Sequence, residues 1–332
     1  MFSIKICVQV LFALLGICTA LELCTAAPAA ANSVAAVPAA AVPEAAVPEA
    51  VVPAAQVPAE VAVAIADAAR PPEEVARDGE RRTAEALAFA GVGPGDRVAD
   101  FMSGGAYFTR LFSRIVGDRG HVYAFLPEEQ LTNCAASETA GTRALVGDAH
   151  YANITVLRAS VDHFSAPEPL DLIWTSLNFH DLYDSFMGPA NVPRVVASMF
   201  TALKPGGALV IIDHVAEPGS GVRDTESLHR IDPETIISTV RAAGFVLEAQ
   251  SDLLRNVADH HDRVVFDPAI RGRTDQVVLK FIKPRESAAR LHASLIVRQR
   301  GSDSRASPCT SPVCDKRRAI ALTASAVTRN EN

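Results

Sequence analysis

The amino-acid sequence predicts an α/β protein with a doubly wound, mostly parallel sheet. Between residues 97 and 245, short apolar segments alternate five times with segments of helical spacing. This alternation is typical of parallel strands joined by crossover helices. The segment 170–177, LDLIWTSL, is apolar on both faces, as expected of a central parallel strand. Sheets of this kind bind ligands beyond the carboxyl ends of their central strands.

The predicted elements follow one another from residue 73. A helix over 73–90, with acidic residues early, precedes the turn GVGPGD. Residues 107–116 place apolar side chains at i, i+3, i+4 and i+7, which is one helix face. Asp232, Pro233 and Gly244 are the residue types of an N-cap, a first turn and a C-terminal stop. We predict strands over 97–101, 121–125, 153–159, 170–177, 208–214, 245–252 and 274–284, and helices over 73–90, 107–116, 191–203 and 232–245, with another beginning near Pro127.

The two ends of the chain differ in composition from the middle. Residues 1–26 combine Lys5 with an apolar run and then small residues, which predicts a signal peptide, with a retained membrane anchor as the alternative. Residues 27–69 are rich in Ala and Pro, with a proline every five residues from 38 to 58, and predict a disordered linker. Residues 285–332 lack hydrophobic periodicity and predict a disordered tail. One domain, residues 70–284, is large enough to bury its own core.

Charge and cysteine content limit the partners and the location that we predict. The tail from residue 285 holds nine basic and four acidic residues, a balance of +5, whereas the whole chain carries −7. The domain is therefore acidic, which argues against a nucleic-acid partner. Six cysteines form neither a disulfide framework nor a zinc motif. We expect an exported protein, periplasmic or secreted, with membrane association through its N-terminal segment as the alternative. The basic tail is either disordered or a contact for anionic lipid or polymer, and no oligomeric state is predicted.

Ser103, Gly104 and Gly105 lie where the first predicted strand turns into its helix, directly after Asp100 and Phe101. Glycine adopts positive φ and lets a ligand lie against the backbone, and the helix behind it offers free N–H groups. A turn that only packs is the alternative. The loop reads S-G-G-A-Y-F and lacks the G-x-G-x-x-G fingerprint, which argues against a nicotinamide-dependent oxidoreductase.

Three segments together resemble a known superfamily. DFMSGGAYFTRLFSRIVGDRGHVYAF is similar to the first motif of class I S-adenosylmethionine-dependent methyltransferases, and LKPGGALVIIDH is similar to their fifth-strand region. AAGFVLEAQSD and TDQVVLKFIKP match their closing antiparallel hairpin. The resemblance covers roughly 75–284 and implies a seven-stranded, Rossmann-like sheet. NFHDLYD, HRIDPETI and SDLLRNVADHHDRVVFDPAIRGRTDQ further resemble a poorly characterised group of exported bacterial methyltransferase-like proteins.

The resemblance implies S-adenosylmethionine as the cofactor and assigns its contacts. Asp100 is expected to order the loop and face the methionine amino group. The superfamily loop often reads G-x-G-x-G, whereas Ala106 and Tyr107 stand at the later positions here. The acid that ends the second strand in the superfamily is displaced here to Glu128, which we predict to reach the ribose; its alternative is an acid in a helix's first turn. Asp162 is expected near the adenine. The predicted cofactor-binding residues are Asp100, Ser103, Gly104, Gly105, Glu128, Asp162 and Asn178.

NFHDLYD follows the fourth strand, where the superfamily places substrate and catalytic groups. We predict His180 and Asp181 as catalytic, because a neutral imidazole can take a proton from the attacking nucleophile. Methyl transfer depends more on alignment than on a strong base, so His180 as a positioning or capping group is the alternative. His214 and His229 either line the same cleft or are structural. The run 259–262, DHHD, has no i, i+4 histidine pair, so we predict no metal site.

Two functions remain open from the sequence. The first is S-adenosylmethionine-dependent methyl transfer to a small-molecule acceptor. The second is a non-catalytic, exported binding protein on the same fold with an eroded cofactor site. The displaced acid and the thinned glycine loop favour the second function. So does export, because the cofactor is made in the cytosol.

Overall fold

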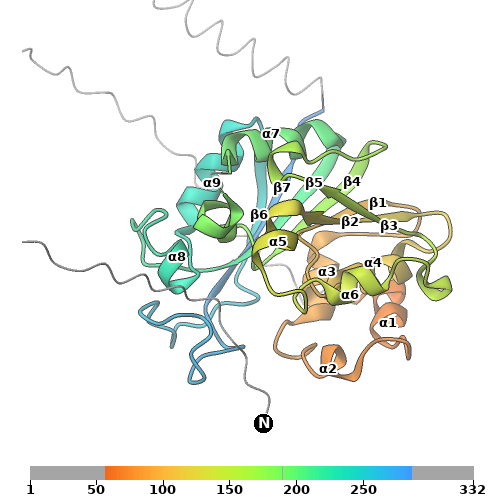
Figure 1. Ribbon diagram of the computed structural model, residues 1–332, viewed down its shortest axis with the longest axis horizontal. Coiled ribbons are helices and arrows are strands. Elements are labelled where there is room, and N and C mark those ends of the chain that lie inside the picture. Colours follow the sequence, from red (N-terminus) through yellow and green to blue (C-terminus); the bar gives the residue numbers. More distant parts are fainter. Residues whose placement is uncertain (1–56, 189, 286–332) are drawn as a thin grey trace, which may run out of the picture. The chain divides into compact units, whose positions relative to one another are not determined.

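The computed structural model describes residues 57–188 and 190–285, and these form an α/β fold around one sheet (Figure 1). The strand order is β3-β2-β1-β4-β5-β7-β6. Strands β1 to β5 pair in parallel, and β7 is antiparallel to both β5 and β6. The predicted doubly wound, seven-stranded sheet with a C-terminal antiparallel pair is therefore confirmed.

The strands of this sheet lie close to their predicted ranges. They are β1 (Arg97–Phe101), β2 (His121–Pro127), β3 (Ile154–Ala159), β4 (Leu170–Ser176), β5 (Leu203–His214), β6 (Val246–Ser251) and β7 (Gln276–Ile282). The α-helices are α1 (Ala59–Ile65), α2 (Pro72–Val75), α3 (Thr83–Ala90), α4 (Tyr107–Val116), α5 (Glu128–Asn133), α6 (Ala140–Ala144), α7 (Val192–Ala202), α8 (Thr225–Leu228) and α9 (Pro233–Ala242). The 3₁₀ turns are η1 (Ala149–Tyr151), η2 (Val161–His163), η3 (His180–Tyr183) and η4 (Ser185–Met187).

Helices cover both faces of the sheet, as Figure 1 shows. Helices α7 and α9 pack on one face through buried Val, Ile and Met side chains, and α1, α3 and α4 pack on the other. Strand β4 contributes to both layers, since Ile173 belongs to the first and Trp174 to the second. The Trp174 ring lies 4.6 Å from that of Phe108 and 5.6 Å from that of Phe112, which fixes α4 on the sheet.

The predicted helix over 73–90 is wrong, because the structure divides it. Helix α2 ends at Val75, and α3 begins at Thr83 after Arg82, whose φ is 46°. The intervening turns carry Asp78 inward, where it binds the Arg70 guanidinium at 2.7 Å and accepts from the Tyr107 hydroxyl at 2.5 Å. These long-range polar contacts outweigh a helical spacing that is only a weak local preference.

The folded part of the chain begins earlier than predicted. Helix α1 lies inside the range 27–69 that we predicted as linker, and its Val61 and Ala64 are fully buried against the α4 layer. At the other end, the compact unit that contains the sheet ends at Lys283, next to the predicted boundary at 284. The predicted signal peptide, the proline repeat to residue 56 and the tail from residue 286 lie outside the described residues. None of the described helices is long and apolar enough to cross a membrane.

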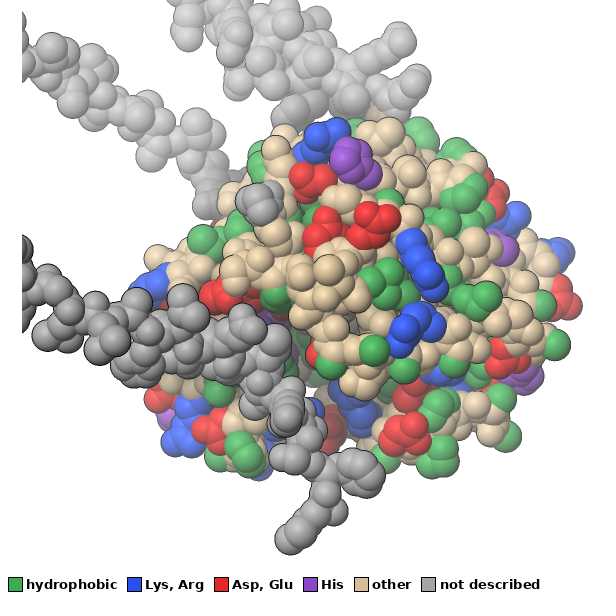
Figure 2. Space-filling model, viewed as in Figure 1, with side chains coloured by type: hydrophobic (Ala, Val, Ile, Leu, Met, Phe, Trp, Pro, Cys, Tyr) green, Lys and Arg blue, Asp and Glu red, His purple; other side chains and the backbone are tan. Residues whose placement is uncertain are grey.

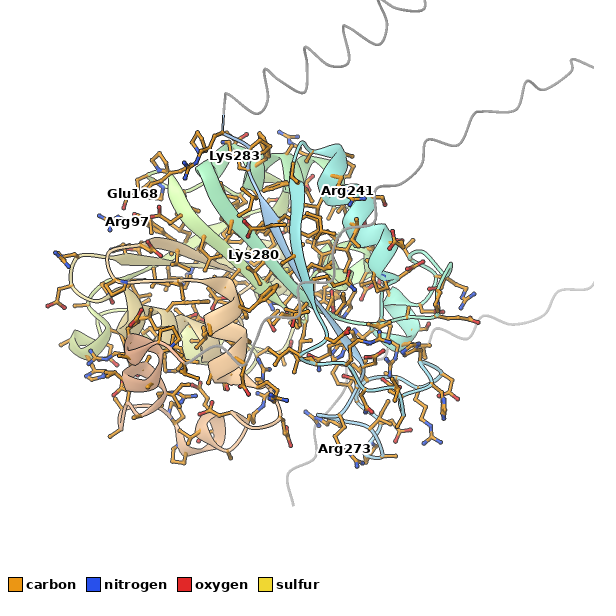
Figure 3. All side chains as sticks on the ribbon, turned by 180° about the vertical axis from the view of Figure 1, so that it is seen from behind. Arg97, Glu168, Arg241, Arg273, Lys280 and Lys283 are labelled. Carbon is orange, nitrogen blue, oxygen red and sulfur yellow. The ribbon has the colours of Figure 1, made fainter. Side chains whose placement is uncertain are left out.

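Polar pairs fix the edge of the sheet where β1 begins. Arg97 donates from Nε to Glu168 at 2.7 Å, and its backbone N–H donates to Asp171 at 2.9 Å. Figure 3 shows Arg97 and Glu168 side by side at this edge. On the face drawn in Figure 2, acidic and basic side chains lie interspersed among neutral ones.

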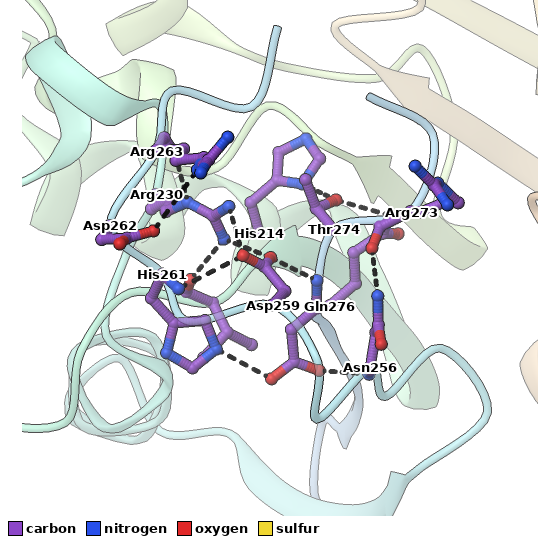
Figure 4. A network of polar contacts seen from close by, with 12 residues as sticks. His214, Arg230, Asn256, Asp259, His261, Asp262, Arg263, Arg273, Thr274 and Gln276 are labelled. Atoms are coloured by element: carbon purple, nitrogen blue, oxygen red, sulfur yellow. Dashed lines mark hydrogen bonds and ion pairs between the residues drawn. The ribbon is translucent and has the colours of Figure 1, made fainter. Parts of the chain in front are cut away.

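A buried ion pair holds the long connection between β6 and β7 (Figure 4). Arg230 is fully buried and contacts both carboxylate oxygens of Asp259, at 2.9 and 3.0 Å. Its remaining donors reach the carbonyl oxygens of Val215 and Arg263, both at 2.9 Å. Asp259 also accepts from the Asp275 backbone N–H at 2.7 Å. Asp259 of the DHHD run thus anchors this connection to Arg230 and, through it, to the residue after β5.

We expect Asp259→Asn to lower the free energy of unfolding by about 3 kcal/mol, because it leaves a buried arginine without its counter-charge. The matched control is Asp262→Asn in the same run, whose side chain is 69% exposed; it should change stability by less than about 0.5 kcal/mol. Urea unfolding of both variants measures the difference. Equal effects at the two positions would contradict the anchoring role of the Arg230–Asp259 pair.

Candidate functional site

The carboxyl ends of β1, β4 and β5 meet at one edge of the sheet, and the loops that follow them form the candidate site. The Asn178 side chain, after β4, donates to the Met102 carbonyl oxygen at 2.9 Å and so joins the two loops. The Ser103 backbone N–H donates to the Phe125 carbonyl oxygen of β2 at 3.1 Å. The glycine loop is therefore held by both neighbouring strands.

Three alternate residues of this loop have left-handed backbone conformations. The φ angles are 61° at Met102, 50° at Gly104 and 71° at Ala106. Only one of these three positions is glycine. A non-glycine residue in this region costs roughly 1–2 kcal/mol, so the loop conformation is held against strain.

Gly105 approaches the chain's own backbone. A Cβ atom on Gly141 of α6 would lie 2.0 Å from the Gly105 carbonyl oxygen, so position 141 must lack a side chain, whereas a Cβ on Gly105 itself would meet nothing within 4 Å. The Thr142 hydroxyl donates to the Gly104 carbonyl oxygen at 2.8 Å. Helix α5, which precedes α6, contacts η4, because the Asn133 side chain donates to the Phe186 carbonyl oxygen at 2.6 Å. On this side, the glycine loop is covered by residues that follow β2.

Asp100 is buried beneath the loop, with 4% of its surface exposed. The Thr109 hydroxyl of α4 donates to its carboxylate at 2.6 Å. Burial raises the pKa of Asp100 to about 7, and the Thr109 hydrogen bonds and the charge of Arg81 offset part of this rise. The carboxyl group is thus poised to ionise when a cation approaches it.

A pocket lies at the ends of β4 and β5, and one of its lining residues, Arg81, is near enough for its charge to act on Asp100. Its lining includes Arg77, Arg81, Phe108, Ser176, His214 and Phe266. The Arg81 guanidinium lies 4.5 Å from the Tyr107 ring, and no described residue accepts a hydrogen bond from its buried Nε. Burial, followed by the charge of Arg77, lowers the pKa of Arg81 to about 10. The pocket wall therefore offers an unsatisfied cation to an anionic group of a ligand.

None of the seven predicted cofactor-binding residues is among the residues that line this pocket, and two of them have other surroundings. Strand β2 ends in buried Leu126 and Pro127, and Glu128 is exposed in the first turn of α5. Its neighbour Glu129 instead accepts from the Ser160 hydroxyl at 2.6 Å and from the Val161 backbone N–H at 3.0 Å. Asp162 accepts from the Asn191 backbone N–H at 2.8 Å, at the entry to α7. The roles of Glu128 at the ribose and Asp162 at the adenine stay predictions.

His180 is held between two carboxylates and is 2% exposed. Its Nδ1 lies 2.7 Å from Asp213 of β5, and its Nε2 lies 3.0 Å from Asp181. Burial alone would lower the pKa of His180, but the two carboxylates raise it well above its ordinary value. In this arrangement the ring holds a proton on each nitrogen and takes up none. The catalytic roles of His180 and Asp181 stay predictions.

Two further histidines lie within ring contact of His180. The ring of His214 is 6.0 Å away and that of His229 is 5.4 Å away. His214 is neutral, because burial and then the charges of His180 and Arg230 lower its pKa well below the ordinary value. Its Nδ1 lies 2.7 Å from the Thr274 hydroxyl oxygen. His214 lines the pocket, whereas His229 faces Asp181 and Asp184 at 3.7 and 3.8 Å.

Sequence reasoning did not single out three residues of this edge. Arg81 fell within the predicted helix over 73–90, Asp184 ended the NFHDLYD motif without a role, and Asp213 lay near the end of a predicted strand. Asp184 is 2% exposed, and burial raises its pKa. The only signal in the sequence was that Asp184 lies in the segment after the fourth strand and Asp213 near the end of the fifth.

Comparison with known proteins gives matches to methyltransferases. No family model matches the chain. The chain is 33% identical over 144 residues to the ubiquinone/menaquinone biosynthesis C-methyltransferase UbiE of Vibrio parahaemolyticus. The aligned segment covers 42% of this chain and 51% of that protein. It is 28% identical over 195 residues to UbiE of Vibrio cholerae, covering 58% and 63%. The chain thus spans about half to less than two thirds of the length of these relatives.

Solved structures are similar at lower sequence identity. A SAM-dependent methyltransferase from Aquifex aeolicus is 16% identical with a TM-score of 0.43, over 64% of this chain and 93% of that chain. The [4+2]-cyclase SpnF is 16% identical with a TM-score of 0.47, over 66% and 84%.

The strand order, the glycine loop after β1 and the matched methyltransferase sequences agree with one another. The chain resembles the class I S-adenosylmethionine-dependent methyltransferase superfamily in strand order and in sequence. The predicted superfamily resemblance is confirmed, and the predicted cofactor agrees with it. The resemblance to an exported subgroup stays a prediction.

Asp100→Asn should change how stability depends on pH. A carboxyl whose pKa is about 7 when folded and 3.8 when unfolded binds its proton more tightly in the folded state. Its contribution to stability is therefore full below about pH 4 and is lost as pH rises to 7, a loss on the order of 2–4 kcal/mol. Urea unfolding at pH 5 and pH 8 should show a flatter dependence for Asp100→Asn.

The control for this measurement is Asp118→Asn, in an exposed turn. Its unfolding free energy should follow the wild-type pH dependence in parallel. If Asp100→Asn also ran parallel to the wild type, the carboxyl would not be protonated in the folded state near neutral pH.

Proposed function

We propose that this protein transfers a methyl group from S-adenosylmethionine to a small-molecule acceptor. The observation that carries the proposal is the buried Asp100 carboxyl at the end of β1, directly before the glycine loop, with the charge of Arg81 acting on it, at the edge of the sheet where folds of this strand order bind ligands. The names of the sequence relatives support the same class of reaction.

The residues present fit the amino-acid end of the cofactor. That end carries an ammonium and a carboxylate group, and the site offers one buried carboxyl and one guanidinium with an unsatisfied donor among the described residues. Asp100 would hold the ammonium group and Arg81 the carboxylate, by charge-assisted hydrogen bonds. At the ribose end, Glu128 is the first acid after β2, and its exposure leaves it free to turn toward the hydroxyl groups.

The cofactor, when bound, supplies a methyl group on a positively charged sulfur that is open to in-line attack. The chain's part is to align the acceptor and to receive a proton where the nucleophile loses one. His214 suits the second task because it is neutral and lines the pocket. When the His214 Nδ1 carries the proton and donates it to the Thr274 hydroxyl oxygen, the Nε2 has a free lone pair. No hydrogen bond joins this Nε2 to another described residue. His180, doubly hydrogen-bonded, positions the loop.

The names of the relatives supply the first acceptor class to test. They describe C-methylation in ubiquinone and menaquinone biosynthesis. A quinone-ring precursor is therefore the first acceptor to test. The pocket's aromatic side chains, Phe108 and Phe266, suit the stacking of a ring.

A non-catalytic binding protein is the second candidate, and two observations favour it. Strand β2 ends in an apolar residue instead of an acid, and the backbone of Gly141 lies against Gly105, where a ligand would otherwise approach. On this proposal the fold is inherited and the pocket holds a different anionic ligand.

Calorimetric titration with S-adenosylhomocysteine tests the cofactor site in the full chain. We expect binding that Arg81→Gln and Asp100→Ala each weaken by about 10- to 100-fold, since a hydrogen bond to a charged group contributes about 1.5–3 kcal/mol. Arg82→Gln is the matched control, because its side chain is half exposed and pairs only with Glu85 among the described residues. Absence of binding by the folded wild type would overturn methyl transfer. Full binding by Arg81→Gln would overturn the placement of the carboxylate.

Turnover separates the two candidate functions. Transfer of a labelled methyl group from S-adenosylmethionine to quinone-ring precursors should occur with the wild type and fall at least about 100-fold in His214→Gln, as expected on loss of an acid–base group. S-adenosylhomocysteine affinity should stay unchanged in that variant. Binding without any turnover across the acceptor panel would favour the non-catalytic protein.

A further inference from the structure

Four side chains converge beside the pocket and are not needed to hold the cofactor. We call His180, Asp181, Asp184 and His229 the two-histidine cluster. One ligand atom from each lies within 4.8 Å of every other. Three of them follow β4, on η3 and directly after it, and His229 follows α8 with a left-handed φ of 54°. Residues some 45 positions apart in sequence therefore converge at one point.

The separations within the cluster suit a bound metal ion. The His180 Nε2 lies 3.0 Å from Asp181 Oδ1, and the His229 Nδ1 lies 3.7 Å from the same oxygen and 3.8 Å from Asp184 Oδ2. Four tetrahedral ligands at about 2.0–2.2 Å from a zinc ion stand about 3.3–3.6 Å from one another. Small side-chain shifts would bring all four to these distances.

Asp184 is a second observation that points to a cation as ligand. It is 2% exposed, and no described residue donates a hydrogen bond of good geometry to either of its carboxylate oxygens. The nearby Thr225 hydroxyl donates to the Val222 carbonyl oxygen at 3.3 Å, and the His229 Nδ1 lies 3.8 Å from Asp184. Burying a carboxylate without a hydrogen-bond donor is costly, and Asp181 beside it adds a second negative charge. An ion between the two acids would satisfy both.

The surroundings of the cluster orient its ligands. Asp213 is fully buried, and its Oδ1 lies 2.7 Å from the His180 Nδ1, so it fixes the proton on that nitrogen and leaves Nε2 for the cluster. Carboxylate–histidine–metal arrangements of this kind are general at metal sites. The Phe266 ring packs 4.9 Å from that of His229. The side chains of Asp181 and His229 are partly exposed, which leaves a path for an ion to enter.

We propose that the two-histidine cluster binds one divalent transition-metal ion of the zinc type, through two imidazole nitrogens and two carboxylate oxygens. Imidazole ligands favour such ions over magnesium and calcium, which prefer all-oxygen sites. The DHHD run is a different case. Both Asp259 and Asp275 already have arginine and backbone partners, and His261 lies 3.0 Å from Asp275.

Zinc titration of the full-length chain, stripped of metal by chelation, tests the site. Calorimetry should give one Zn²⁺ per chain, and substitution with Co²⁺ should give the visible absorption of a site of low coordination number. Asp184→Asn and His229→Gln should each weaken Zn²⁺ binding by at least about 10-fold, since losing an outer-shell partner alone costs that much. His260→Gln, an exposed histidine in the DHHD run, is the matched control and should bind like the wild type.

Thermal unfolding gives a second readout that does not depend on enzyme activity. Without metal, Asp184→Asn should melt at or above the wild-type temperature, because it removes a buried charge that accepts no hydrogen bond of good geometry from the described residues. With Zn²⁺, the wild type should gain stability by linkage and the variant should not. Absence of stoichiometric Zn²⁺ binding by the wild type, or an equal loss in His260→Gln, would overturn the proposal. S-adenosylhomocysteine affinity, measured without metal, reports the cofactor site separately.

Discussion

The buried carboxylate of Asp213 is the interaction on which the candidate site depends. It ends β5, is fully buried, and accepts from the backbone N–H groups of His180 and His214, both at 2.8 Å. Its Oδ1 also faces the His180 ring at 2.7 Å. Donors from the loops after β4 and β5 thus converge on one anion, and charge-assisted bonds in a buried site are strong and directional. The pocket wall at His214 and the two-histidine cluster at His180 both take their positions from it.

The sheet and most of its helices follow from local patterns in the sequence. Strand β1 and helix α4 occupy their predicted ranges, and Asp232 accepts from the Glu234 backbone N–H as an N-cap. These elements are predictable because buried strands and amphipathic helices carry their periodicity within a few residues. The division of the 73–90 segment was not predictable in this way. Its cause, the contact of Asp78 with Arg70 and Tyr107, joins residues that become neighbours only after folding.

The candidate site shows the same contrast. Asp100 and the glycine loop were identified because strand, acid, glycine and helix adjoin in the sequence. Arg81 and Asp184 were not identified, because what distinguishes them is buried polar atoms without a hydrogen-bond partner among the described residues. That property depends on tertiary packing and cannot be seen in a local sequence pattern. Gly141 was passed over because its close contact is with Gly105, 36 residues earlier. The end of β2 was partly predictable. The sequence showed that the acid is displaced, but only the structure shows that Leu126 near the end of this strand is fully buried.

The pocket and the two-histidine cluster are electrically distinct but adjacent. Arg77 and Arg81 make the pocket wall cationic, whereas Asp181 and Asp184 make the cluster anionic, and His214 stands between them. The pKa of His214 is lowered first by burial and then by the positive charge of His180. If a metal ion replaced the second proton of His180, a positive charge would remain at the same point and His214 would stay neutral. The two proposed sites are therefore compatible. A cation bound by Asp184 would also keep the His214 imidazole neutral, which is the state in which it can receive a proton at the pocket wall.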